Sequence, residues 1–183
     1  MLFWKVEGNT KTKWKFYKFI SSYVHDAKDY SITNELFNTS SANDFFAVRD
    51  GQQRLTAMRI GIYGSYSYHE PRKSWTYSNT SFPLRHMYLC LSKTGSKNDD
   101  CQYFFSFLKD TDTNINTFFT DSEENIWLRV GSVIDYHHSG EEISDYFEEI
   151  DLNKDQRKII KRLENTIFTD PSITFYQEDE QTS

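Results

Sequence analysis

The pattern of hydrophobic and polar positions predicts short strands along much of the chain. Apolar runs of about four to eight residues, continuous or alternating with polar ones, are typical of strands. Such runs occur at residues 1–6, 45–48, 84–91, 101–108, 126–130 and 173–176. The polar stretch 93–100 favours a hairpin between two of these strands. Residues 64–83, which hold two of the three prolines, are expected to form a loop.

Apolar side chains at spacings of three and four residues predict helices elsewhere. Residues 12–27 have this spacing, and lysines at positions 11, 13, 15 and 18 fall largely on the other side. The apolar face of this expected helix consists of Trp14, Tyr17, Ile20 and Val24. A second helix is expected from Gln52 to about Tyr63.

The last third of the chain is expected to be helical. Ser139-x-x-Glu142 and Asn153-x-x-Gln156 both have the spacing of a capping box, in which two side chains bind N–H groups at a helix start. Two helices should therefore begin there, and Pro171 should end the second. The acidic residues 177–183 are expected to form a loose tail.

Length and composition favour one folded domain over residues 1–183. Apolar residues make up only 37% of the chain, but aromatic residues reach 17%. Each aromatic ring buries a large area, so a core is feasible. Together with the expected elements, this predicts an α+β fold: a small mixed β-sheet with packed helices and a helical C-terminal part.

Cysteine usage and hydropathy predict a cytoplasmic setting and no membrane partner. Cys90 and Cys101 form no CxxC pair, only four apolar residues precede Lys5, and no apolar run approaches the roughly 18 residues that span a bilayer. The net charge of −6 excludes a basic footprint over the whole domain. Residues 1–30 nevertheless hold six lysines against three acidic residues, either as a phosphate contact or as a solvated helix face.

The most informative stretch is a predicted strand, a glycine turn and a helix start around Asp50–Arg54. The first N–H groups of a helix lack partners and attract anions. Gly51 lets the backbone approach a ligand, and the planar guanidinium of Arg54 suits phosphate oxygens. These features predict a phosphate-binding turn.

The remaining motif side chains suit the same chemistry. Gln52 and Gln53 offer donors and acceptors, Thr56 adds a hydroxyl, and the Asp50 carboxylate can hold Mg²⁺ or orient a water. The alternative is a structural turn in which Asp50 caps the helix and Arg54 is a surface charge.

The run DGQQRLTA, residues 50–57, resembles the hallmark of the N-terminal domain of GmrSD-type restriction enzymes, which has a ParB/sulfiredoxin-like fold. The match is specific over about residues 45–64. The resemblance implies a bacterial anti-phage defence protein that binds a nucleoside triphosphate with Mg²⁺ and hydrolyses it, gating an HNH-type nuclease partner. It implies that Arg54 and residues Gly51–Gln53 hold phosphate, and that Asp50 orients metal or water.

Three departures accompany this resemblance. Arg49 stands where the family usually has an apolar residue. The family's upstream Gln-Arg and Tyr-x-Trp elements and its downstream Asn-Ser-Gly-Gly stretch do not occur, so we expect the natural domain to extend beyond both ends of this sequence. The sequence also lacks a His-Asn-His type metal site, so we expect no DNA cleavage by this chain.

Two other functions stay open. A ParB-like module would contact DNA through the turn and the basic first helix without turnover. A purely structural domain would pair Asp50 with Arg54 or with neighbours. The pairs His25-Asp26, His69-Glu70 and His137-His138 are weak metal-ligand candidates: adjacent histidines rarely share a metal, and the other two pairs have no third partner, so loop or surface roles are expected. An aromatic cluster could stack bases, but packing on the sheet is expected: Tyr63, Tyr66, Tyr68, Trp75 and Tyr77.

Overall fold

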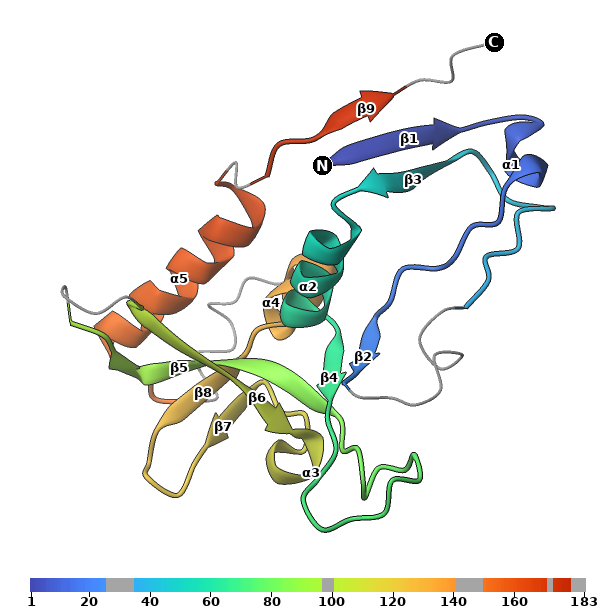
Figure 1. The fold of residues 1–183 in the computed structure, drawn as a ribbon. Coiled ribbons are helices and arrows are strands. Elements are labelled where there is room, and N and C mark those ends of the chain that lie inside the picture. Colours follow the sequence, from blue (N-terminus) through green and yellow to red (C-terminus); the bar gives the residue numbers. More distant parts are fainter. Residues whose placement is uncertain (26–34, 97–100, 141–149, 171–172, 179–183) are drawn as a thin grey trace.

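A small mixed sheet forms one end of the molecule in the computed structural model, which describes residues 1–25, 35–96, 101–140, 150–170 and 173–178. The order is β3-β1-β9, with β1 antiparallel to β3 and parallel to β9. The three strands are β1 (Leu2–Val6), β3 (Phe45–Asp50) and β9 (Tyr176–Glu178). Among the described strands, β3 is the outer one and pairs only with β1, so its other edge has no strand partner there (Figure 1).

A six-stranded sheet forms the other half. Its path is β2-β4-β5-β8-β7, and β6 pairs with β5 as the expected antiparallel hairpin. The strands are β2 (Ser22–Val24), β4 (Ser65–Ser67), β5 (Arg85–Thr94), β6 (Tyr103–Lys109), β7 (Phe118–Thr120) and β8 (Ile126–Arg129).

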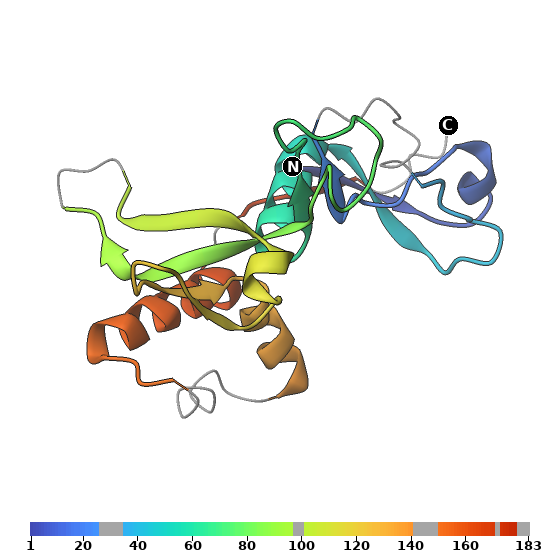
Figure 2. The ribbon, with the colours of Figure 1, turned by 90° about the horizontal axis from the view of Figure 1, so that it is seen from below.

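Five helices are described: α1 (Thr10–Lys13), α2 (Gln52–Ile62), α3 (Asp110–Thr113), α4 (Ser132–Ser139) and α5 (Lys154–Phe168). Helix α2 leads from β3 of the small sheet to β4 of the large one (Figure 1). Helices α4 and α5 lie on one side of the large sheet (Figure 2). The α+β class and the helical C-terminal part are therefore confirmed.

The main core lies between the large sheet and the two C-terminal helices. Strands β5 and β8 contribute Leu89, Leu91 and Leu128, and α5 contributes Ile159 and Ile160, all buried. The capping box predicted at the start of α5 is confirmed: the Asn153 side chain accepts from the Gln156 N–H at 3.0 Å, and the Gln156 side chain accepts from the Asn153 N–H at 2.9 Å.

The helix predicted over residues 12–27 is wrong. Of its described residues, 12–25, only Thr12 and Lys13 are helical, as the end of α1 (Thr10–Lys13). The chain then extends toward β2, with the Phe37 N–H donating to the Phe16 carbonyl at 2.8 Å. Phe16 packs on Phe45, with ring centroids 5.0 Å apart, whereas Trp14 is 63% exposed. Aromatic residues favour extended backbone, and here that propensity and the packing of Phe16 prevail over the helical spacing.

Two smaller corrections concern segment ends. The expected loop over 64–83 contains β4, which pairs with β2 and β5. The final strand is β9, so Gln177 and Glu178 belong to a strand rather than to a loose tail, because the Tyr176 N–H donates to the Met1 carbonyl and Glu178 pairs with Arg49. The helix expected after Ser139 lies largely at 141–149, outside the described residues.

Candidate functional site

The motif forms a tight corner between β3 and α2. Gly51 has a left-handed backbone, with φ of 87°, and the Leu55 N–H donates to its carbonyl at 3.0 Å as α2 begins. A side chain rarely adopts this conformation, which explains glycine at this position. Among the described residues, no side chain accepts a hydrogen bond from the first N–H groups of α2. The corner thus has the geometry of an anion-binding helix start.

Asp50 and Arg54 lie together on the surface of this corner. The Arg54 Nη2 is 3.7 Å from the Asp50 Oδ2, and the two side chains are 66% and 72% exposed. The hypothesis of a purely structural domain predicted a pair between these two residues. Exposed pairs four residues apart on a helix contribute only about 0.3–0.5 kcal/mol, so the pair can open readily for a ligand.

Gln52 and Thr56 lie on a different side of the corner. Both line a pocket of about 550 Å³. The Gln52 Nε2 donates to the Val48 carbonyl at 2.8 Å, which fixes the side chain across the end of β3. Gln53 is exposed, and neither it nor Asp50, Gly51 or Arg54 is among the described residues that line the pocket. The structure therefore divides the motif between an exposed ion pair and a pocket.

We call this cavity the β3-edge pocket. Its lining comes from β3, the extended segment 15–20, Phe37 and the start of α2. Its described lining is Lys15, Phe16, Tyr17, Lys18, Phe19, Ile20, Phe37, Phe45, Phe46, Ala47, Val48, Gln52 and Thr56. The lining includes two lysines and no acidic residue. The sequence did not indicate the pocket, because its apolar spacing predicts a helix over segment 15–20; the interleaved lysine and aromatic residues were the available signal.

Arg49, the departure directly before the motif, pairs with a residue of β9 on the other side of β1. Its Nη1 lies 2.5 Å from the Glu178 Oε2. The pair joins β3 to the end of β9 across the small sheet, since both strands flank β1. A charged residue is accommodated at this position because Arg49 is exposed and has a counterion.

Metal ligands are sparse around the motif. Among the described residues, no group of three or more His, Cys, Asp or Glu side chains is arranged to hold a metal. Asp50 fits only the kind of Mg²⁺ site in which one carboxylate, substrate phosphates and waters share the coordination. His137 stacks on Phe168 with centroids 3.9 Å apart, and His69 stacks on Trp75 at 3.8 Å; Asp26 lies outside the described residues.

The predicted aromatic cluster is divided between packing and exposure. Tyr66 stacks on Tyr23 with centroids 5.9 Å apart and contacts Phe107 at 5.3 Å. Trp75 contacts Phe82 at 6.3 Å but remains 53% exposed. The cluster is thus anchored on the large sheet while several rings still face solvent.

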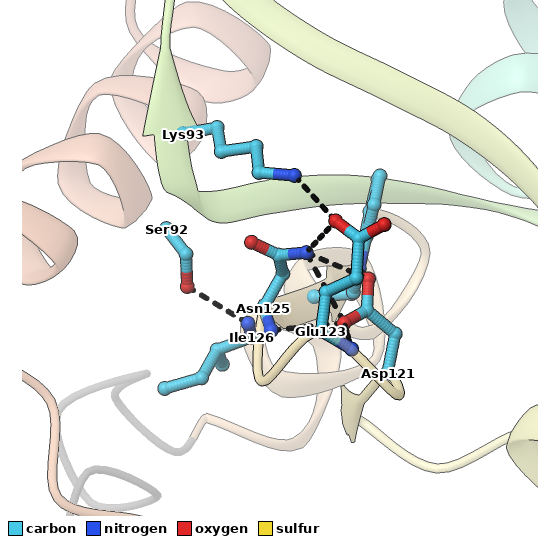
Figure 3. A network of polar contacts seen from close by, with 7 residues as sticks. Ser92, Lys93, Asp121, Glu123, Asn125 and Ile126 are labelled. Atoms are coloured by element: carbon cyan, nitrogen blue, oxygen red, sulfur yellow. Dashed lines mark hydrogen bonds and ion pairs between the residues drawn. The ribbon is translucent and has the colours of Figure 1, made fainter.

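A polar network closes the β7–β8 hairpin (Figure 3). The Asp121 carboxylate accepts from the Asn125 side chain, from the Trp127 Nε1 at 2.9 Å and from the Glu123 N–H at 2.9 Å. These hydrogen bonds lower the pKa of Asp121 to about 2, and the bond from the Asn125 side chain has the largest effect. Lys93 pairs with Glu123 at 2.9 Å. Because its polar groups bind one another, the network fixes the hairpin.

A second charged cluster holds the buried start of β5. The Arg85 guanidinium lies 3.7 Å above the Tyr68 ring, donates to the Pro83 carbonyl at 3.0 Å and pairs with Glu70. Glu70 also pairs with Lys109 at 3.1 Å. The hydrogen bond from Lys109, opposed by desolvation and aided by both cations, lowers the pKa of Glu70. This ion-pair cluster connects the 68–83 loop to β5 and β6.

Comparison with known proteins identifies no family. No family model matches the chain, and the curated proteins contain no significant match to it. The described residues include no helix long and apolar enough to cross a membrane.

Proposed function

We propose that this chain is a nucleotide-binding and nucleoside-triphosphate-hydrolysing module of a GmrSD-like bacterial defence protein, with a ParB/sulfiredoxin-like fold and no nuclease activity of its own. The observation that carries the proposal is the corner at Gly51. A left-handed glycine connects an outer strand to an uncapped helix start, and an exposed arginine lies in the first turn of that helix. That combination suits the phosphates of a nucleotide.

The motif residues have different roles in binding and hydrolysis. The N–H groups at the start of α2 and the Arg54 guanidinium hold phosphate oxygens, and Arg54 neutralises charge that develops during hydrolysis. The Asp50 carboxylate would orient the attacking water or help to hold Mg²⁺. Bound Mg²⁺ supplies charge neutralisation on the phosphate oxygens. The nuclease partner, of the HNH type, would respond to this cycle from another domain or chain.

The Asp50–Arg54 pair must open before Arg54 can bind phosphate. A triphosphate carries more negative charge than one carboxylate, and the guanidinium binds phosphate with two parallel hydrogen bonds. Because both side chains are solvent-exposed, little free energy opposes the exchange. Binding also frees the Asp50 carboxylate for Mg²⁺ or water.

Phosphate release by the 183-residue chain tests the proposal. We expect release from ATP or GTP that requires Mg²⁺ and falls at least about a hundredfold in Arg54→Ala, by analogy with the removal of one charge-stabilising group from other active sites. Arg59→Ala is the matched control, because Arg59 is also an exposed arginine of α2. Equal release by the parent chain and Arg54→Ala, or no nucleotide binding by calorimetry, contradicts the proposal.

DNA binding without turnover is the second candidate, and one observation favours it. Lys13, the last residue of α1, and Lys15, which lines the β3-edge pocket, are both exposed. This candidate predicts that the affinity for duplex DNA falls steeply with salt concentration and that the chain releases no phosphate from nucleotides. In Lys15→Ala, the slope of the logarithm of the binding constant against the logarithm of the salt concentration should decrease by about one. These results would support DNA binding over the first candidate.

A further inference from the structure

We infer that the β3-edge pocket binds the nucleoside part of the nucleotide, with the base against its aromatic side chains. The inference rests on the proposed function, in which the phosphates bind at the corner Asp50–Arg54. It adds a binding site that the motif alone does not indicate.

The pocket adjoins the proposed phosphate site through helix α2. Gln52 is the first residue of α2 and Thr56 lies one turn further, so the first turn of the helix borders both sites. A nucleotide whose phosphates meet the N–H groups of this turn therefore has its nucleoside within reach of the pocket. The volume of about 550 Å³ lies within the range of small-molecule sites, roughly 300–1,000 Å³.

Aromatic rings in the pocket have fixed positions. Phe45 makes edge-to-face contacts with Phe16 and Phe37, with centroids 5.0 and 5.2 Å apart and interplanar angles of 86° and 83°. Phe16 also contacts Trp4 at 6.0 Å. Phe46, on the neighbouring position of β3, is 55% exposed and offers an accessible ring. Bases stack on such rings without regard to sequence, because every base has a π-face.

Charge in the pocket complements a nucleotide. Lys15 and Lys18 line it, no acidic residue is among its described lining, and the whole chain has a net charge of −6. Lys18 pairs with Glu35 at 2.6 Å, whereas no ion pair of Lys15 is found among the described residues. Because the nucleoside itself is uncharged, the positive charge of Lys15 complements the phosphates that bind beside the pocket, at the start of α2.

Polar groups at the α2 end can contact the sugar or the base. The Gln52 Nε2 is bound to the Val48 carbonyl, so its Oε1 is oriented as an acceptor. The Thr56 hydroxyl, on the same helix face, can donate or accept. A pocket lined mainly by apolar and aromatic side chains with a few polar groups is typical of small-molecule and cofactor sites.

Calorimetric titration with two ligands separates this inference from the proposed function. The ligands are MgATP and magnesium tripolyphosphate, which shares the phosphates but has no nucleoside. We expect the chain to bind MgATP at least about tenfold more tightly. Phe46→Ala should weaken MgATP binding by about tenfold, consistent with loss of one stacked ring, and leave tripolyphosphate unchanged.

Two further variants complete the test. Lys15→Ala should weaken MgATP about threefold or more, and Phe104→Ala is the control, since Phe104 is an exposed aromatic residue of β6 outside the pocket. Equal affinity for both ligands, with no effect of Phe46→Ala or Lys15→Ala, overturns the inference and leaves the phosphate site standing. If neither ligand binds, the proposed function is overturned and the inference with it.

Discussion

The guanidinium of Arg54 lies 3.7 Å from the carboxylate of Asp50, across the glycine turn between β3 and α2. The two residues that the proposed mechanism assigns to phosphate and to metal or water therefore neutralise each other in the ligand-free chain. A structural role and a functional role for this pair make opposite predictions when the two charges are exchanged.

The double exchange Asp50→Arg with Arg54→Asp should retain stability and abolish phosphate binding. The exchanged charges can still pair, and an acidic residue in the first turn of α2 suits the helix dipole. Phosphate at the corner would instead face a carboxylate on the helix. We expect the free energy of unfolding to stay within about 0.5 kcal/mol, as for other surface changes, while tripolyphosphate binding in calorimetry is lost.

The single variants provide the comparison for this exchange. Arg54→Ala should also lose phosphate binding, and its stability should change little because the pair is exposed. If the double exchange binds tripolyphosphate as tightly as the parent chain, the charge of Arg54 has no role in binding and the corner is structural.

Gly51→Ala should destabilise the chain by about 1–2 kcal/mol, the cost of a left-handed conformation for a residue with a Cβ. The added Cβ would also lie 2.9 Å from the Met1 Cγ, so the Met1 side chain must shift. Gly8→Ala is the matched control: Gly8 is left-handed too, with φ of 51°, but nothing lies within 4 Å of an added Cβ. Urea unfolding should show the larger loss at Gly51, and no loss at either position contradicts the backbone argument.

Local signals predicted the elements that flank the candidate site. The apolar run Phe45–Val48, the Asp-Gly pair and the following helical spacing correctly placed β3, the corner and α2. The capping box at Asn153 correctly placed α5. Each of these signals lies within about ten residues of sequence, so no distant contact is needed to detect it.

Distant contacts decided what the sequence did not predict. Segment 15–20 is extended because Phe16 packs against Trp4 and Phe45. The backbone of the segment also forms an antiparallel bridge between Tyr17 and Leu36. None of these partners is adjacent in sequence, and the helical spacing of Trp14 and Tyr17 pointed elsewhere. The β3-edge pocket needs this segment beside β3, so the sequence could place Gln52 and Thr56 on a helix without indicating the pocket they line.

Asp121→Asn should lower stability at neutral pH and change its dependence on acid. The carboxylate has a pKa of about 2 in the folded chain, below the ordinary 3.8, because Asn125 and Trp127 donate to it. A folded-state pKa below the unfolded value gives stability that is full above about pH 4 and is lost as the pH falls toward 2. The difference in unfolding free energy between the parent chain and Asp121→Asn should therefore shrink over this range.

Urea unfolding at pH 6 and at pH 2.5 measures this difference. Glu124→Gln, in the same hairpin loop, is the control, because it removes a carboxylate of this loop and leaves the side-chain bonds to Asp121 in place. An Asp121→Asn curve parallel to the parent curve across this range would show that the network in Figure 3 does not stabilise the charged form of the carboxylate.

Glu70→Gln should destabilise the chain by about 3 kcal/mol, because it leaves the Arg85 charge without its counterion. The Arg85 side chain is only 1% exposed, so water cannot replace the lost carboxylate. Lys109→Ala is the comparison: Lys109 is 34% exposed, and its removal leaves the Glu70–Arg85 pair in place, so a smaller loss is expected. Thermal and urea unfolding measure both.

The double variant Glu70→Gln with Arg85→Met tests whether the buried charge of Arg85 causes this loss of stability. Replacing both partners of a buried pair with uncharged side chains of similar length removes the isolated charge, and this is often neutral or stabilising in other proteins. The double variant should therefore regain most of the stability that Glu70→Gln loses. If it is as unstable as the single variant, the loss comes from the Glu70 contacts with the 68–83 loop and Lys109, and the buried charge of Arg85 is not its cause.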